Sequence, residues 1–492
     1  MGELWQLTRL SLVNDSRRAG LHAVRFGLVL VLYLAIVVTH LLSTTTAAGL
    51  PLFRAQLLIT AFYLSVNAIF GFSQSIAEER EDESLGLMRL AGVSALAILF
   101  GKTLSRLIDA GLLIAIQLPF TIVAVTLGGV SIPQVSAAYG ALFAYLWLLA
   151  TIGIAASVRA PSGGAAARWT GIFLAIYVLP PFLSMLTTRM PSPLLRQFYD
   201  LFSLPLRFMT VTESAFNDPV WCWPILFALA FGMGCLIDAW RMFDRVAVGR
   251  EVIGKVSLLP PLRKHAPRRA WDLPILGRVF QFETGGKRWV YFRAGAQLAI
   301  LAAMFLVQET PGRCFVWALL WGGLLCLFDA TWSASGLFRN EIREQTWSTL
   351  VQTPRGLVNI VTEKWIGWAL GLAPSIVLPY AWCAAANLTA DWVPFEAKVE
   401  LTIGSLTFGV GILAYLQLLV LLTLYFGWQA TPLTLTICFA AGWVYVIAVH
   451  ATRWSTSTRC VFFVATWLVL AGVIVFLWRL SLARLRELAA TG

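Results

Sequence analysis

Two clusters of charged residues interrupt an otherwise apolar chain, and their residue types are the strongest indication of function in this sequence. The first cluster reads Glu78-Glu79-Arg80-Glu81-Asp82-Glu83, which places five carboxylates within six residues. The second cluster reads Glu341-Ile342-Arg343-Glu344. Neither cluster contains a histidine, which makes an enzyme active site the weakest interpretation. Carboxylates clustered between apolar segments favour an electrostatic contact with a basic surface on a soluble partner.

Each cluster leads into a short amphipathic segment and then to a lysine, Lys102 or Lys364. The segments are residues 84–92 and 346–355, and their apolar positions suit a short helix on or near a membrane surface. Gly92 and Pro354 are expected to end these helices. A solvated loop with Ser84 and Thr346 as helix caps is the alternative for either segment alone. The apolar side chains of the segments include Leu85, Leu87, Met88, Trp347 and Leu350.

The composition indicates a membrane protein. Hydrophobic residues make up 59% of the chain, charged residues only 13%, and the mean hydropathy is +0.76. Soluble domains carry about twice that share of charge. The apolar residues form continuous runs, long enough to cross a hydrocarbon core of about 30 Å as helices, whereas a β-barrel needs short alternating segments.

The apolar runs predict an all-α polytopic membrane protein with about twelve transmembrane helices. The first six predicted spans are roughly residues 25–42, 55–77, 106–127, 135–157, 169–188 and 219–240. The second six are roughly residues 290–307, 315–338, 365–388, 400–426, 430–450 and 459–478. Residues 1–24 are polar, and no small-residue cleavage site follows the first apolar run, so no cleavable signal is expected.

Lysine and arginine are concentrated in the segments that would face the cytoplasm if both termini lie inside. This asymmetry predicts the orientation, and it also accounts for a net charge of +12. A basic inner face against anionic membrane lipid explains the charge better than nucleic-acid binding.

The polar stretch 241–289 predicts a cytoplasmic linker between two domains, residues 1–240 and 290–492. Six spans before the linker give both halves the same direction, as in a parallel repeat. A shift of about 262 residues places Ser73 on Ser335, Glu79 on Glu341 and Lys102 on Lys364. Two copies of one six-helix unit explain this shared order.

The first cluster and its surroundings resemble the loop after the second span of type-2 ATP-binding-cassette exporter permeases. The matching pattern is Glu79-Arg80-Glu81-x-x-Ser84-Leu85-x-Leu87-Met88-x-Leu90-Ala91-Gly92, followed by Gly101-Lys102. The second half keeps Arg343-Glu344, Thr346, Leu350, Thr353-Pro354 and Glu363-Lys364. The first copy lacks the Thr-Pro of the family, and the second has Trp347 in place of leucine and Glu363 in place of glycine.

The resemblance implies the membrane-spanning permease of an exporter in the bacterial cytoplasmic membrane, with two nucleotidase subunits on the cytoplasmic side. Residues 79–92 and 341–355 are then coupling helices and their flanks. ATP and magnesium would bind the partners, because Gly101-Lys102-Thr103 lacks the glycine that a phosphate-binding loop needs at Leu96. The chain itself is expected to be neither an enzyme nor a cofactor binder. The residues assigned to coupling are Glu79, Arg80, Glu81, Asp82, Glu83, Leu85, Leu87, Met88, Lys102, Glu341, Arg343, Glu344, Trp347, Leu350, Pro354 and Lys364.

A few polar residues fall inside predicted spans, where they are costly and commonly functional. Asp329 lies in the eighth span, and Asn67 is its counterpart in the first half. Either a gating or substrate-contact role or a structural hydrogen bond between helices fits Asp329. Asp109 lies near the inner end of the third span, where it could reach water or pair with Arg106.

Two other classes of protein fit the sequence less well. A twelve-span secondary transporter needs coupling charges along its pathway, and Asp329 is the one clear candidate. A membrane enzyme or a scaffold without transport is the other alternative. The seven cysteines and four histidines show no ligand spacing, so no metal site is expected.

Overall fold

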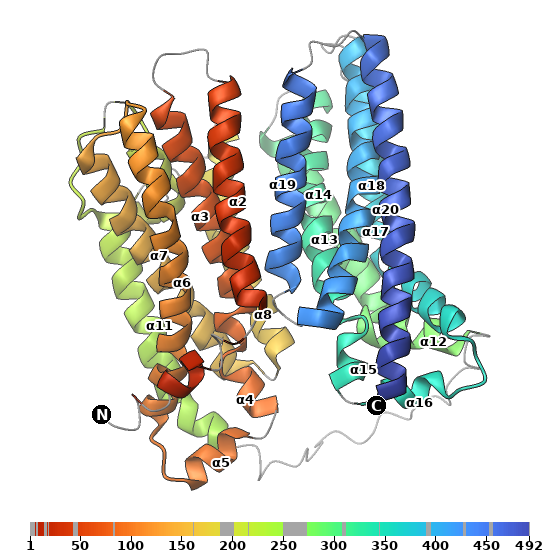
Figure 1. Ribbon diagram of the computed structural model, residues 1–492, viewed down its shortest axis with the longest axis horizontal. Coiled ribbons are helices and arrows are strands. Elements are labelled where there is room, and N and C mark those ends of the chain that lie inside the picture. Colours follow the sequence, from red (N-terminus) through yellow and green to blue (C-terminus); the bar gives the residue numbers. More distant parts are fainter. Residues whose placement is uncertain are drawn as a thin grey trace. The chain divides into compact units, whose positions relative to one another are not determined.

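The computed structural model describes most of the chain (Figure 1). It leaves out residues 1–4, 6–7, 14–16, 18, 43–47, 82–83, 161, 187–200, 215, 249–272, 308–310, 344, 390–394, 427–429, 452–455 and 492, and in several helical stretches it describes only the backbone. Of the described residues, 89% are helical and none lies in a strand, which confirms the all-α class. Asp82, Glu83, Glu344, the side chain of Arg343 and much of the predicted linker fall outside the described residues.

Eight helices within the described residues are long and apolar enough to cross a membrane, so the chain is an integral membrane protein with multiple spans. They belong to α2 (Ala19–Leu42), α3 (Gly49–Phe70), α6 (Ala95–Thr126), α7 (Ile132–Arg159), α11 (Trp223–Val248), α17 (Leu357–Thr389), α18 (Phe395–Phe426) and α20 (Thr456–Thr491).

A helix also covers each of the four remaining predicted spans. These helices are α8 (Gly163–Leu186), α13 (Gly286–Val307), α14 (Pro311–Gly336) and α19 (Ala430–Ala451). α13 contains two arginines, and parts of the other three helices are described only as backbone. The total of twelve spans therefore stays a prediction.

The contacts divide the chain into two units. Unit 1 comprises residues 1–258 and 435–452, and unit 2 comprises residues 259–434 and 453–492. Two short elements from the predicted linker region belong to unit 2, namely α12 (Pro274–Arg278) and the π-helical turn η2 (Val279–Glu283).

The centre of unit 1 is formed by α3 and α7, which are buried along most of their length. α3 packs against α2, α6 and α7, while α7 also packs against α8 and α11. Gly153 of α7 allows the turn that follows α3 to approach closely, because a Cβ there would lie 2.7 Å from the side chain of Phe72. The hydroxyls of Ser65 and Tyr145 share a 2.7 Å hydrogen bond between α3 and α7. Such bonds satisfy polar groups that hydrocarbon cannot.

Unit 2 is organised around α14 and α17. α17 packs against α12, α13 and α14, while α18 packs against α14 and α20. The hydroxyls of Thr331 on α14 and Tyr415 on α18 share a 2.9 Å hydrogen bond. In each unit, therefore, a hydroxyl on the second long helix meets a tyrosine on the fourth.

Short helices follow the second long helix of each unit. They are α4 (Ala77–Glu81) and α5 (Ser84–Leu90) in unit 1, and α15 (Arg339–Arg343) and α16 (Trp347–Val351) in unit 2. Figure 1 shows α4 and α5 at the end of unit 1 where α3 ends and α6 begins, and α15 and α16 at the corresponding end of unit 2. Gly92 ends α5 as predicted: its φ is +82°, and Val93 N donates to Met88 O at 3.1 Å.

Candidate coupling sites and a buried polar network

Glu79 joins the short helices of unit 1 to the third long helix. Lys102 Nζ on α6 donates a 2.5 Å hydrogen bond to Glu79 Oε1. The Ser84 hydroxyl, at the start of α5, contacts the other carboxylate oxygen of Glu79 and lies 3.1 Å from its backbone carbonyl oxygen. Because these contacts come from two helices, α4, α5 and α6 are held together at the end of unit 1 where α3 ends and α6 begins.

Arg80 and Glu81 each close the end of a neighbouring helix. The Arg80 guanidinium donates to the carbonyls of Ser157, Val158 and Ala160 at the end of α7, at 3.1, 2.6 and 2.6 Å. Glu81 Oε1 accepts a 2.8 Å hydrogen bond from the Gly163 N–H at the start of α8. Both side chains satisfy backbone groups that a helix leaves unpaired, and each has the sign of charge that complements the helix dipole.

The two faces of α5 have different surroundings. Leu85 is buried in an apolar cluster with Phe243 of α11, and Met88 packs against the same cluster. Leu87 and Leu90 point the other way, with 68% and 85% of their surface exposed. α5 is therefore fixed by one face and presents two leucines on the other.

Further ion pairs line the N-terminal half of α6. Asp109 pairs with Arg25 of α2 at 2.8 Å, a partner that the sequence did not indicate. Arg106 lies 3.9 Å from Glu78. Together with Lys102, these residues link the start of α6 to α2 and α4.

In unit 2, Lys364 occupies the place that Lys102 has in unit 1, but it is fully buried. It pairs with Glu341 and donates a 2.7 Å hydrogen bond to the Leu337 carbonyl. Its Nζ also lies 3.6 Å from Glu283 Oε1 and 5.0 Å from the centre of the Phe338 ring. Two carboxylates and a carbonyl thus compensate the cost of burying an ammonium group.

Glu283 is the second acid of this group. Burial, opposed by Lys364 and reinforced by Glu341, raises the pKa of the Glu283 carboxyl above its usual value. Glu283 comes from η2, Glu341 from α15 and Lys364 from α17. Three separate elements of unit 2 therefore meet at one ammonium group.

Trp347 ties the second short helix to the last helix of the chain. Its indole Nε1–H donates a 3.0 Å hydrogen bond to the Leu485 carbonyl on α20, and its ring meets Phe338 edge to face. Only 2% of Trp347 is exposed. Leu350 is half-buried, and Pro354 is exposed beyond the end of α16. α16 thus offers a largely polar exposed surface, unlike α5.

The same contacts recur at the same intervals in the two units. The Glu79–Lys102 and Glu341–Lys364 pairs each join residues 23 positions apart. The hydroxyls of Ser84 and Thr346 each contact the backbone carbonyl of the glutamate five positions earlier, at 3.1 and 3.4 Å. The positions matched by the shift of about 262 residues therefore make equivalent contacts.

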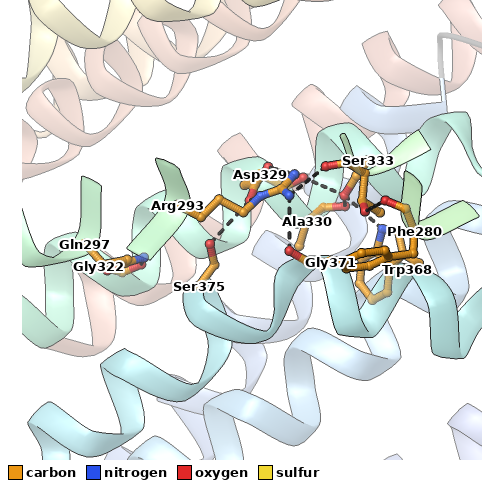
Figure 2. A network of polar contacts seen from close by, with 11 residues as sticks. Phe280, Arg293, Gln297, Gly322, Asp329, Ala330, Ser333, Trp368, Gly371 and Ser375 are labelled. Atoms are coloured by element: carbon orange, nitrogen blue, oxygen red, sulfur yellow. Dashed lines mark hydrogen bonds and ion pairs between the residues drawn. The ribbon is translucent and has the colours of Figure 1, made fainter. Parts of the chain in front are cut away.

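Asp329 is part of a polar network inside unit 2 (Figure 2). Arg293 of α13 donates to both Asp329 carboxylate oxygens, Nε to Oδ2 at 2.6 Å and Nη2 to Oδ1 at 3.1 Å. Arg293 Nη1 donates to the carbonyls of Thr284 and Gly371, and the Ser375 hydroxyl donates to Asp329 Oδ2 at 3.3 Å. The charge is paired and hydrogen-bonded, which is the arrangement that a buried ionised group requires.

Arg293 was not among the predicted site residues, although a positive charge three residues into a predicted span signals a partner for Asp329. The counterpart Asn67 is half-buried in α3, and a Cβ at Gly71 would lie 2.3 Å from its amide oxygen. The shift of about 262 residues places Val31, which is fully buried, opposite Arg293. The charge pair of unit 2 therefore has uncharged residues at the matching positions of unit 1.

The described residues contain no group of three or more histidine, cysteine or acidic side chains that could hold a metal ion. No protein-family model matches the chain, and no curated protein matches it. The sites described above are therefore interpreted from their own chemistry.

Proposed function

We propose that this chain is the permease of an ATP-binding-cassette exporter, with substrate moving through the membrane helices and ATP hydrolysed by two separate cytoplasmic subunits. The observation that carries the proposal is the recurrence of one Glu–Lys pair and one Ser/Thr contact beside a short helix in each unit. The same set of contacts at the same place in two units fits a protein that responds to two partner subunits.

The packing of the short helices supports a role in transmitting motion. α5 rests on α11 through Leu85 and is tied to α6 through Glu79. α16 is tied to α20 through Trp347, and the preceding α15 to α17 through Glu341. A push on α5 would thus reach α6 and α11, and a push on α15 and α16 would reach α17 and α20.

The contacts also separate positioning residues from docking residues. Glu79, Arg80, Glu81 and Glu341 bind within their own unit, so their charges serve to hold the short helices in place. In unit 1 the exposed Leu87 and Leu90 are the better docking candidates, since buried apolar anchors dominate most interfaces.

The test is co-purification with the ATP-binding-cassette nucleotidase encoded beside this chain. We expect the variant Leu87→Glu with Leu90→Glu to lose the nucleotidase and its stimulated ATPase activity. The control is Ile132→Glu, which places a charge on an equally exposed residue at the other end of unit 1. Retention of the nucleotidase by the double variant would contradict the docking assignment, and absence of any such complex would contradict the proposed function.

The Arg293–Asp329 pair favours a second candidate, a secondary transporter, because such proteins carry ionisable groups inside the membrane. Reconstitution of the chain alone separates the two. Flux driven by an ion gradient without any nucleotidase would favour the secondary transporter.

A further inference from the structure

The corner of unit 2 made by α12, η2 and the start of α13 exposes aromatic and basic side chains together. The most exposed aromatic residue is Phe282 of η2, at 80%. Trp289 and Phe292 lie edge to face, with ring centres 5.1 Å apart. The exposed side chains of this lipid corner, as we call it, are Phe282, Lys287, Arg288, Trp289, Tyr291 and Phe292.

The lipid corner lies at the level where the charged inner end of unit 2 gives way to its apolar part. Lys364 is the last charged residue of α17. One turn later, α12 and η2 pack closely against Gly367. A Cβ at Gly367 would lie 2.7 Å from the Leu276 carbonyl oxygen, and one at Gly371 would lie 2.1 Å from the Thr284 hydroxyl. The corner is therefore fixed against a membrane span at its interfacial end, where aromatic belts form.

The two exposed cations of the corner have no carboxylate partner among the described residues. The nearby acids are already used, since Asp329 pairs with Arg293, and Glu283 and Glu341 lie against Lys364. Lys287 and Arg288 thus place two uncompensated positive charges among exposed aromatic rings.

We propose that the lipid corner binds the headgroup of an anionic phospholipid from the cytoplasmic leaflet. The phosphate would accept hydrogen bonds from Lys287 and Arg288, while the rings of Phe282, Tyr291 and Phe292 contact the glycerol and upper acyl chains. This site does not depend on the source of energy for transport, so it stands apart from the proposed function.

The site adjoins the Lys364 cluster through one short turn. η2 carries the exposed Phe282 and, next to it, Glu283, whose carboxylate lies 3.6 Å from Lys364. Lipid bound outside this turn would hold the segment that brings Glu283 to Lys364 and Glu341.

Lipid retention by the full-length protein tests the proposal. The purified chain is exchanged into nanodiscs of phosphatidylcholine with a small fraction of phosphatidylglycerol, and the bound lipids are counted by native mass spectrometry. We expect Lys287→Gln with Arg288→Gln to weaken phosphatidylglycerol binding by about 30-fold, from the attraction of two cations to an anionic surface. Phosphatidylcholine retention should not change.

Two matched variants complete the design. Arg241→Gln with Arg486→Gln removes the same charge from exposed positions on α11 and α20 and should keep phosphatidylglycerol bound. Lys287→Arg with Arg288→Lys keeps both charges and should bind like the parent, which shows that the corner itself folds. Unchanged phosphatidylglycerol binding in the Lys287/Arg288 glutamine variant, or an equal loss in the Arg241/Arg486 variant, would overturn the proposal.

Discussion

Trp347 and Leu485 are joined by a 3.0 Å hydrogen bond from the indole N–H to the backbone carbonyl, although 138 residues separate them in the chain. This bond ties α16 directly to α20. Only 2% of Trp347 is exposed, so its side chain packs inside unit 2.

Replacing Trp347 should separate packing from hydrogen bonding. Trp347→Phe keeps most of the buried aromatic ring but loses the N–H donor. We therefore expect the free energy of unfolding to fall by about 1 kcal/mol. Trp347→Ala leaves a cavity beside Phe338 and should cost about 3–5 kcal/mol. Thermal unfolding of the detergent-solubilised chain measures both losses, and equal losses would show that the ring contributes little.

The buried Glu341–Lys364 pair should be more sensitive than the partly exposed Glu79–Lys102 pair. The side chain of Lys364 is 1% exposed and that of Lys102 is 25% exposed. Removing one partner of a buried ion pair lowers the free energy of unfolding by about 3–5 kcal/mol, because the other charge is left buried without its partner. We therefore expect Glu341→Gln to destabilise the protein more than Glu79→Gln.

A double variant checks this reasoning. Glu341→Leu with Lys364→Met removes both charges and should recover much of the stability lost in Glu341→Gln, with Glu283 left as the nearest acid. A double variant as unstable as the single one would indicate that the pair does more than balance charge.

Asp329 and Arg293 should be tested as a pair. Asp329→Asn leaves Arg293 buried with its two carbonyl acceptors, so we expect lower thermal stability. Asp329→Asn with Arg293→Gln should restore stability. Transport by the two variants then decides the role of the pair. A stable double variant that transports like the parent would show that the pair is structural. A stable double variant that does not transport would show that the charges act in gating or substrate contact.

The raised pKa of Glu283 predicts a pH dependence with a definite sign. A carboxyl whose pKa is higher in the folded state binds a proton more tightly there. Its contribution to stability is complete below the unfolded value, about 4.3, and is lost as pH rises through the folded value. Compared with Glu283→Gln, the parent chain should lose melting temperature as pH increases across this range, and parallel melting curves would contradict the assignment.

The local pattern of the sequence predicted the positions of the short helices and the matching residues within them. The predicted shift matches Glu79, Ser84 and Lys102 to residues that make the same contacts. This match could be predicted because each contact joins residues at most 23 positions apart in the chain. The end of α5 at Gly92 was predictable too, because a helix commonly ends at a glycine in the left-handed conformation, which is a local preference of the chain.

The partners that come from distant elements could not be predicted from the sequence. Glu283 and Leu485 reach their sites only because η2 packs against α17 and α20 packs against α16. The sequence predicts a coupling role for Arg80 and Glu81, and it gives no sign that they bind the ends of α7 and α8, about 80 residues later in the chain. Packing between helices decides such contacts, and spacing along the chain does not reveal it.

The unequal residues at matching positions have an evolutionary consequence. If two identical chains assembled into such a protein, every substitution would enter both sides, and the Arg293–Asp329 pair would bring four charges into the membrane. A single chain holding both units can have the pair in one unit and Val31 and Asn67 at the matching positions of the other. Joining the units thus lets one unit carry an ion pair while the other has uncharged residues, which avoid the cost of burying ions.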